Sequence, residues 1–296
     1  MRATRHLSWV PALLLLGCNQ LLGNEEGELG GEVEVLVPEQ GIPGEGLFTV
    51  RPDTTTGNLT GMGWFIWHGD GGGVIPNGYT SEGQRTTCKQ KKLSACTVTS
   101  CSWQKDPSVV LNKPQYVSAG TLTAKCGAGA AVPATLDAGK QLYKLDAGAP
   151  CAPGEKVTIS ASGDVAPAFS AEVAALSPTA LLTPNPKADL ALSRSGGLSL
   201  TWNPSGGSLL VTADGAVSGP DSGESWYVHC QYDAAAGSGT VPPAALAKVP
   251  LLTQLIVNVT ISDPRVVTPN ADWRIGVSYA GLGVAELAHW ETLLLE

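Results

Sequence analysis

Short runs of alternating or β-branched residues recur along this chain, and they are separated by segments that contain Gly, Pro, Asn or Asp. A strand places successive side chains on opposite faces, so such runs predict half-buried strands separated by tight turns. No long amphipathic helix pattern interrupts residues 33–280. With 36 Gly and 21 Pro, the composition also favours many short strands over helices. We therefore predict an all-β protein.

The expected strands form two groups on either side of a proline-rich stretch, residues 176–188. Its prolines lack the amide N–H that a sheet needs, so we expect a connector there. This organisation predicts two β-sandwich domains of immunoglobulin-like architecture, a disulfide-containing domain at 33–176 and a second one at 188–296. The expected strands are 32–37, 47–51, 63–68, 95–103, 118–125, 141–145, 156–162, 168–175, 189–193, 198–203, 207–213, 225–232, 254–262 and 273–279.

The N-terminus carries an export signal. Arg2 and Arg5 precede an apolar run at residues 9–16. The run is too short to span a bilayer, which takes about 20 apolar residues, and it ends at small residues, as an export signal does. Residues 15–18, Leu-Leu-Gly-Cys, resemble the lipobox of bacterial lipoproteins at all four positions.

This resemblance implies that the signal peptide, residues 1–17, is removed and that Cys18 receives diacylglycerol and a further acyl chain. Two or more chains anchor a protein stably in a membrane. Asn19 stands where, in this family, Asp favours retention in the inner membrane, so the resemblance implies an outer-membrane location. Residues 18–32 are polar, acidic and rich in glycine, and predict a flexible tether.

Two further resemblances concern the C-terminal half. Residues 198–202, Leu-Ser-Leu-Thr-Trp, are similar to an early core strand of fibronectin type III modules. Residues 226–233 and 237–246, together with 161–170, resemble a pattern of uncharacterised lipobox-bearing bacterial proteins, which implies an architecture and no activity. In the same stretch we expect a strand, a Gly/Ser loop and a proline-started helical turn capped by Thr240. The last twelve residues suit a strand or a short helix.

Six cysteines remain once Cys18 is assigned to lipid. An even number in an exported chain predicts disulfides, although many connectivities fit the sequence. Cys96 and Cys101 would lie about 16 Å apart in one strand, whereas bonded cysteines need Cα atoms within about 7 Å. Each should then have another partner, unless the chain turns between them; Cys230 is expected either as a free, buried thiol or as a bridge between the halves. The disulfide candidates are Cys88, Cys96, Cys101, Cys126, Cys151 and Cys230.

Charge narrows the range of partners. The net charge is −8, and removal of Arg2 and Arg5 makes the mature chain two charges more negative. An acidic surface does not attract nucleic acid. The one basic cluster, residues 89–92, stands among turn-forming residues and is interpreted as a solvated loop.

Motifs for catalysis or metal binding are weak. His68, Asp106 and Ser222 follow the order of trypsin-like proteases, but Pro220 has no N–H to supply to an oxyanion hole. Acidic residues stand mostly in turn contexts, such as Asp214-Gly215 and residues 70–73, which indicate hairpins. No C-x2-C pair accompanies the histidines, so we expect no zinc and no other cofactor. His229 is interpreted as a structural histidine.

Aromatic residues give the remaining candidate site. In a strand, Trp64 and Ile66 face one way, and Phe65 and Trp67 the other. One face should be core; the other presents an aromatic ring, with Trp103 as a further candidate, and such rings suit stacking on sugars. Burial of both faces in a two-layer core is the alternative.

We therefore expect a lipid-anchored envelope protein with a binding or structural role and no catalysis, with an envelope protein or a polysaccharide as its partner. The first alternative is a carbohydrate-binding surface protein using Trp64 or Trp67, and the second is a secreted hydrolase.

Overall fold

The computed structural model describes residues 33–35, 43–53, 55–67, 84–105, 115–137, 139, 142–146, 148–177, 179–219, 221–251, 253–280 and 288–296. The all-β prediction is confirmed, because strands make up nearly all of the regular structure. Seventeen strands belong to one hydrogen-bonded sheet system, and three more form a separate sheet. Within the described residues, no helix is long and apolar enough to cross a lipid bilayer.

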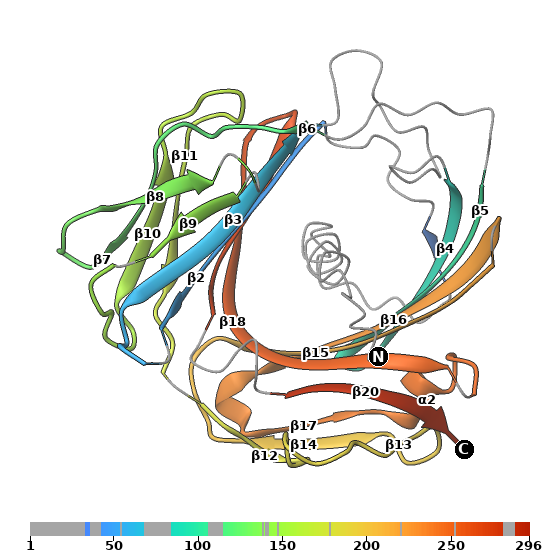
Figure 1. Ribbon diagram of the computed structural model, residues 1–296. Coiled ribbons are helices and arrows are strands. Elements are labelled where there is room, and N and C mark those ends of the chain that lie inside the picture. Colours follow the sequence, from blue (N-terminus) through green and yellow to red (C-terminus); the bar gives the residue numbers. More distant parts are fainter. Residues whose placement is uncertain are drawn as a thin grey trace, which may run out of the picture.

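The strands are arranged in two lobes that share the long strand β18, Gln254–Asn270 (Figure 1). In the first lobe, the C-terminal part of β18 is followed in space by β19, β2, β3, β9, β8, β7, β10 and β11, and β6 adds to β3. The pairing of β19 with β2 is parallel, and the others are antiparallel. The bounds are β2 Gly44–Pro52, β3 Leu59–Trp67, β6 Gln115–Tyr116, β7 Leu122–Cys126, β8 Val132–Asp137, β9 Leu142–Leu145, β10 Lys156–Ala161, β11 Phe169–Ala174 and β19 Trp273–Ala280.

The second lobe has two layers. Its larger sheet runs in the order β1, β4, β5, β16, β15, β18, β20 and β13, and the three-stranded sheet β12–β14–β17 lies below it (Figure 1). The bounds are β1 Val33–Val35, β4 Gln84–Leu93, β5 Cys96–Lys105, β12 Leu181–Thr183, β13 Leu192–Ser193, β14 Leu198–Trp202, β15 Ser208–Ser218, β16 Ser222–Asp233, β17 Ser238–Val241 and β20 Ala288–Leu295, with the short helices η1 Ala234–Ala236 and α2 Pro243–Leu246.

Period-two alternation explains the cores of both lobes. In β14, Leu198, Leu200 and Trp202 are buried while the residues between them are exposed. β18 follows the same rule, with every second residue from Leu255 to Ile261 fully buried. In the first lobe, the ring of Phe65 meets that of Tyr143 edge-on at 5.7 Å between centroids. Alternating apolar residues thus place one face of each strand against its core.

The sheets do not divide at the connector expected at residues 176–188. β5, from the expected N-terminal domain 33–176, pairs along its length with β16 from 188–296. In the opposite direction, β19 from the C-terminal part pairs with β2. The two lobes are therefore each built from both halves of the chain, and the expected connector itself contributes the strand β12.

Three local expectations need correction. The basic cluster at 89–92 lies within strand β4 and not in a loop, because β4 pairs with β5 over its full length. The helical turn begins after Pro242, with no side-chain cap, so Thr240 is not its cap. β18 continues through Pro264 to Asn270, eight residues beyond the predicted end of the strand. The C-terminal residues, which were left open, form strand β20.

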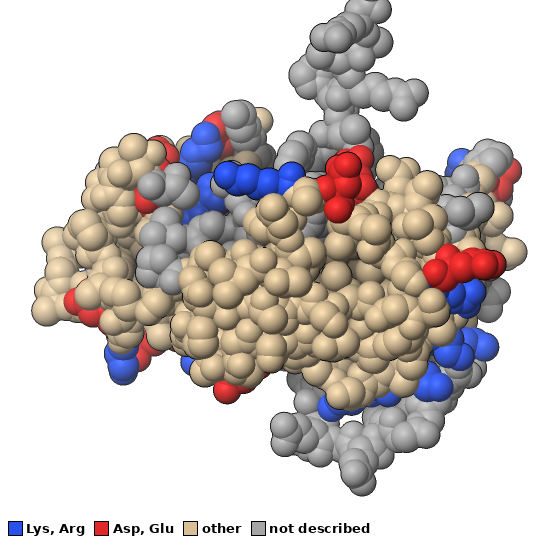
Figure 2. Space-filling view, turned by 90° about the horizontal axis from the view of Figure 1, so that it is seen from below, with Lys and Arg blue, Asp and Glu red and all other residues tan. Residues whose placement is uncertain are grey.

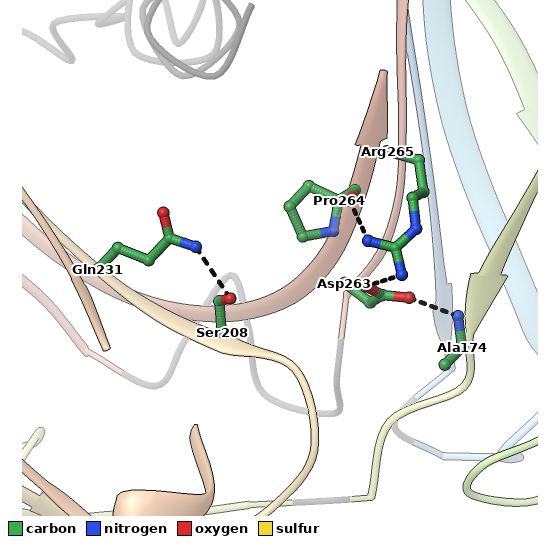
Figure 3. Close-up of polar contacts among 6 residues, drawn as sticks. All are labelled: Ala174, Ser208, Gln231, Asp263, Pro264 and Arg265. Atoms are coloured by element: carbon green, nitrogen blue, oxygen red, sulfur yellow. Dashed lines mark hydrogen bonds and ion pairs between the residues drawn. The ribbon is translucent and has the colours of Figure 1, made fainter. Parts of the chain in front are cut away.

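A polar corner joins the lobes where β18 changes partners. Ser262 faces Ser208 of β15 on one side and Ala280 of β19 on the other. At the next residue, the buried Asp263 accepts a hydrogen bond from the backbone N–H of Ala174 at 2.7 Å and lies 3.2 Å from the guanidinium of Arg265 (Figure 3). This carboxylate ties the last strand of the first lobe, β11, to the shared strand.

Candidate functional site

The larger sheet of the second lobe has one apolar face and one polar face. In β16, Trp226, Val228 and Cys230 are buried in the core, so Tyr227 and His229 project from the opposite face. The same alternation applies to the first half of β18, and to β15 except that Thr212 on the outward side is also buried. The partly exposed Leu210 and Ile256 lie on the same outward side as the polar residues. We call the polar residues of this side the polar sheet face: Gln90, Lys92, Thr97, Thr99, Thr212, Asp214, Tyr227, His229, Gln231, Asn258 and Thr260.

The register aligns these residues in two rows that cross five strands. One row consists of residues 92, 97, 229, 212 and 258, and the next consists of 90, 99, 227, 214 and 256. Adjacent strands are about 4.8 Å apart, so each row is roughly 19 Å long. Because the sheet is curved, with this face on its concave side away from β14, the rows form an inwardly bent surface (Figure 1).

Polar contacts hold these side chains in place. The amide of Gln90 donates to the hydroxyl of Thr99 at 3.2 Å, and Asn258 donates to Thr212 at 3.5 Å. The imidazole Nε2 of His229 lies 3.4 Å from Oδ1 of Asp214. The side chains of this pair are only 17% and 16% exposed, so the pair is largely shielded from water. Fixed side chains of this kind can recognise a ligand with little loss of side-chain entropy.

The polar face ends beside the corner that joins the lobes. Gln231 donates from its amide to the hydroxyl of Ser208 at 3.0 Å (Figure 3). Ser208 also faces Ser262, the residue before the buried Asp263. The end of the face is thereby attached to the point where β18 leaves this sheet.

At the other end, Trp103 lies beside a hollow. Its register partner is Gly223, and a Cβ at that position would come within 2.6 Å of the indole. The ring can therefore lie against the backbone of β16 only because residue 223 has no side chain. The hollow has a volume of about 450 Å³ and is lined by Thr87, Ser102, Trp103, Gln104, Ser222, Gly223 and Glu224.

The three predicted tryptophans do not form one platform. Trp64 and Trp67 point to opposite faces of β3, as expected from their spacing. Trp67 stacks on the buried Trp273, with centroids 5.5 Å apart and planes inclined by 20°, above the glycine at position 44. Trp64 is partly exposed on the other face. Trp103 belongs to the second lobe, so it is separate from both.

All six candidate cysteines are paired. Cys88 bonds to Cys101, and Cys126 bonds to Cys151. Cys96 and Cys230 form a bridge between the two halves of the chain, which was one of the two expectations for Cys230. Cys96 and Cys101 lie in one strand and have different partners, as strand geometry requires. Cys18, the signal peptide and the tether lie outside the described residues.

The hydrolase candidates are only partly visible. Ser222 is the first residue of β16 and faces Gln104, whereas His68, Asp106 and Pro220 lie outside the described residues. Residues 70–73 lie outside them as well. Among the side chains that the structure describes, no group of three or more His, Cys, Asp or Glu is placed to hold a metal ion.

Sequence reasoning missed most of the polar sheet face. Asp214 was interpreted as a hairpin residue, but it lies inside β15 opposite Tyr227. The sequence predicts a structural role for His229, and its position beside Asp214 depends on the pairing of β15 with β16. The available signal was polar alternation within residues 208–214 and 254–262, which was used only to assign strands. Compared with models of protein families and with curated proteins, the chain matches none of them.

Proposed function

We propose that this chain is a lipid-anchored protein outside the cytoplasm that binds a ligand on its polar sheet face and catalyses no reaction. The lipobox at residues 15–18 supports the anchor, and three disulfides suit an oxidising compartment. The observation that carries the binding role is the pair of rows that crosses five strands. We place the anchor in the outer membrane, following the resemblance at Asn19.

A polysaccharide is the ligand class that suits this face best. Hydroxyl and amide groups, which can form hydrogen bonds with sugar hydroxyls, occur in both rows. The first row adds the imidazole of His229, and the second adds the carboxylate of Asp214 and the apolar Ile256. Each row is long enough to contact several units of a polymer, and the indole of Trp103 offers an aromatic surface at the adjoining end. This proposal moves the sugar-binding role away from Trp67, whose ring is stacked on Trp273.

Binding can be tested with the full chain in detergent and a panel of neutral and acidic polysaccharides, by affinity electrophoresis. We expect retardation by at least one neutral polysaccharide. Tyr227 and Thr99 lie on the same row. Tyr227→Ala and Thr99→Ala should each raise the dissociation constant for that polysaccharide roughly tenfold, which corresponds to a loss of about 1.4 kcal/mol of binding free energy. Thr158→Ala is a matched control, because Thr158 is a partly exposed threonine in a strand of the other lobe. Equal loss in the control, or no retardation by any polysaccharide, would contradict the proposal.

The anchor can be tested by the intact mass of the protein purified from membranes of its host. A chain that begins at acylated Cys18 should gain two hydrogens for each of the three disulfides on reduction. An unlipidated chain that begins elsewhere would remove the anchor from the proposal, and the hydrolase alternative would then have to be tested directly for activity.

A further inference from the structure

The hairpin of β4 and β5 concentrates positive charge in an acidic chain. Residues 84–105, which we call the basic hairpin, contain no Asp or Glu. Its five basic residues are Arg85, Lys89, Lys91, Lys92 and Lys105. The chain as a whole has a net charge of −8, so the residues outside the hairpin carry −13. The molecule is therefore strongly polarised, with one basic segment on an otherwise acidic body.

The basic hairpin lies at an edge of the larger sheet. β4 pairs with β5 over its full length, and its other side is bordered by β1, which reaches only residues 88–90. Lys89 and Lys92 are exposed, and Lys91 is partly exposed. Because successive residues of a strand point to opposite faces, Lys89 and Lys91 lie on one face of β4 and Lys92 lies on the other. Figure 2 shows several basic side chains along its right-hand margin, the side on which β4 and β5 lie in Figure 1.

Little negative charge is placed against these lysines. Glu34 of β1 faces Lys89 in the register and balances at most one of the five positive charges. Among the side chains that the structure describes, none of the three lysines of β4 forms an ion pair with an acidic residue. The β5 residues that face them are uncharged: Ser100, Val98 and Thr97. The lysine ammonium groups are therefore available to an anion outside the chain.

The basic hairpin is also where the chain enters the fold. β1 begins at Val33, fifteen residues after Cys18, and pairs directly with β4. An extended chain spans at most about 3.5 Å per residue, so this edge lies within about 50 Å of the residue that the lipobox marks for acylation. No other described strand is as close to Cys18 along the chain.

Given the lipid anchor of the proposed function, on which this role rests, we propose that the basic hairpin docks on anionic phospholipid headgroups of the same membrane. An anionic bilayer attracts basic segments within about a Debye length, roughly 10 Å, and repels acidic ones. Since the acyl chains already supply the attachment, the hairpin needs only to orient the body. Its lysine ammonium groups donate hydrogen bonds to phosphate oxygens, and the acidic remainder of the chain turns toward the solvent.

The test is amine labelling of the full acylated chain, reconstituted in phosphatidylcholine vesicles with or without phosphatidylglycerol as about a third of the lipid. Mass spectrometry gives the labelling of each lysine. We expect phosphatidylglycerol to slow the labelling of Lys89, Lys91 and Lys92 roughly fivefold. About 1 M salt should restore it, because the Debye length then falls to about 3 Å. Lys125 of β7 and Lys156 of β10, in the other lobe, are internal controls whose labelling should not change.

Two double variants separate a local contact from an effect of net charge. Lys89→Gln/Lys91→Gln should abolish the protection of Lys92 by phosphatidylglycerol. Lys125→Gln/Lys156→Gln removes the same charge from the other lobe and should leave that protection intact. Loss of protection in both variants would overturn the proposal. So would equal labelling of the hairpin in the two kinds of vesicle, and the lysines would then serve only to keep the sheet edge from pairing with another chain. A chain that floats with neither kind of vesicle would instead remove the anchor, and the docking with it.

Discussion

Removing the Cys96–Cys230 disulfide should destabilise the fold more than removing either of the other two. A disulfide stabilises mainly by restricting the unfolded chain, and its effect grows with the loop that it closes. The sequence separations are 134 for Cys96–Cys230, 25 for Cys126–Cys151 and 13 for Cys88–Cys101. The loop-entropy relation converts these into about 5, 3.5 and 3 kcal/mol at 25 °C.

The nesting of the bridges changes these values little. Cys126–Cys151 lies inside the larger loop and shortens it, but the logarithm in the relation reduces the effect by only about 0.2 kcal/mol. A loss of about 5 kcal/mol is comparable with the total free energy of unfolding of many proteins, about 5–15 kcal/mol. We therefore expect Cys96→Ala/Cys230→Ala to unfold at a lower urea concentration than Cys88→Ala/Cys101→Ala.

The assay is urea unfolding of both double variants without reducing agent, followed by tryptophan fluorescence. The two variants form a matched pair, because each loses one cysteine from β5 and one from a neighbouring strand. The difference of about 2 kcal/mol is measured from the urea midpoints and the slopes of the transitions. Equal midpoints, or a greater loss in the Cys88 variant, would refute the assignment of loop length as the controlling quantity.

Three more predictions concern stability. Burial raises the pKa of both Tyr232 and Tyr279 to about 12. Their neutral forms therefore favour the folded state, and this stabilisation, roughly 2 kcal/mol each, is complete below pH 10 and lost as pH rises toward 12. Tyr279→Phe should shift the alkaline unfolding midpoint upward, as followed by circular dichroism; an unchanged midpoint would contradict this. Asp263→Ala should cost about 1–3 kcal/mol in urea unfolding, because it leaves the partly buried N–H of the β11 residue at position 174 without its acceptor, while Asp263→Asn should cost less. Gly44→Ala places a Cβ 2.3 Å from the indole of Trp273 and should cost about 1–3 kcal/mol, with a change in tryptophan fluorescence; a stable variant would contradict the close contact.

Local alternation predicted many strands but could not predict their partners. Residues 198–202 and 273–279 alternate so regularly that their burial follows from sequence. β4 was missed, because its sequence is polar and rich in lysine and its pairing comes from β5. The connections between β5 and β16 and between β19 and β2 join residues more than 100 positions apart. Propensity is a local quantity, so nothing in either strand alone specifies such a partner.

β18 continues past Pro264 for a physical reason. A proline cannot donate to a ladder, so within sheets it is confined to edges, strand starts and bulges. Beyond Ser262, β18 pairs with β19 and has left β15 and β20. That part of β18 is an edge strand in the hydrogen-bonding sense, where proline is tolerated. The sequence alone does not show that this part of β18 is an edge, because that depends on where β15 ends beside it in the folded protein.

The candidate site was predictable in kind but not in place. Sequence reasoning sought aromatic residues on a strand face and found Trp64 and Trp67, since spacing alone separates their faces. It could not show that the ring of Trp67 stacks on that of Trp273, more than 200 residues away. The rows of the polar sheet face depend on the register of five strands from both halves of the chain, so no single segment reveals them.

The same long-range connections bear on how the polar sheet face would bind. The Cys96–Cys230 bridge between β5 and β16 and the corner at Ser262, where β18 passes into the other lobe, both lie near the end of the polar sheet face at Gln231. That end of the face is thus held by contacts that any opening of the sheet would have to break. A surface held in this way loses little conformational entropy on binding. Loss of the Cys96–Cys230 bridge in folded protein should therefore weaken ligand binding more than a substitution of the exposed Leu182 does. Neither the bridge nor Leu182 is expected to touch the ligand.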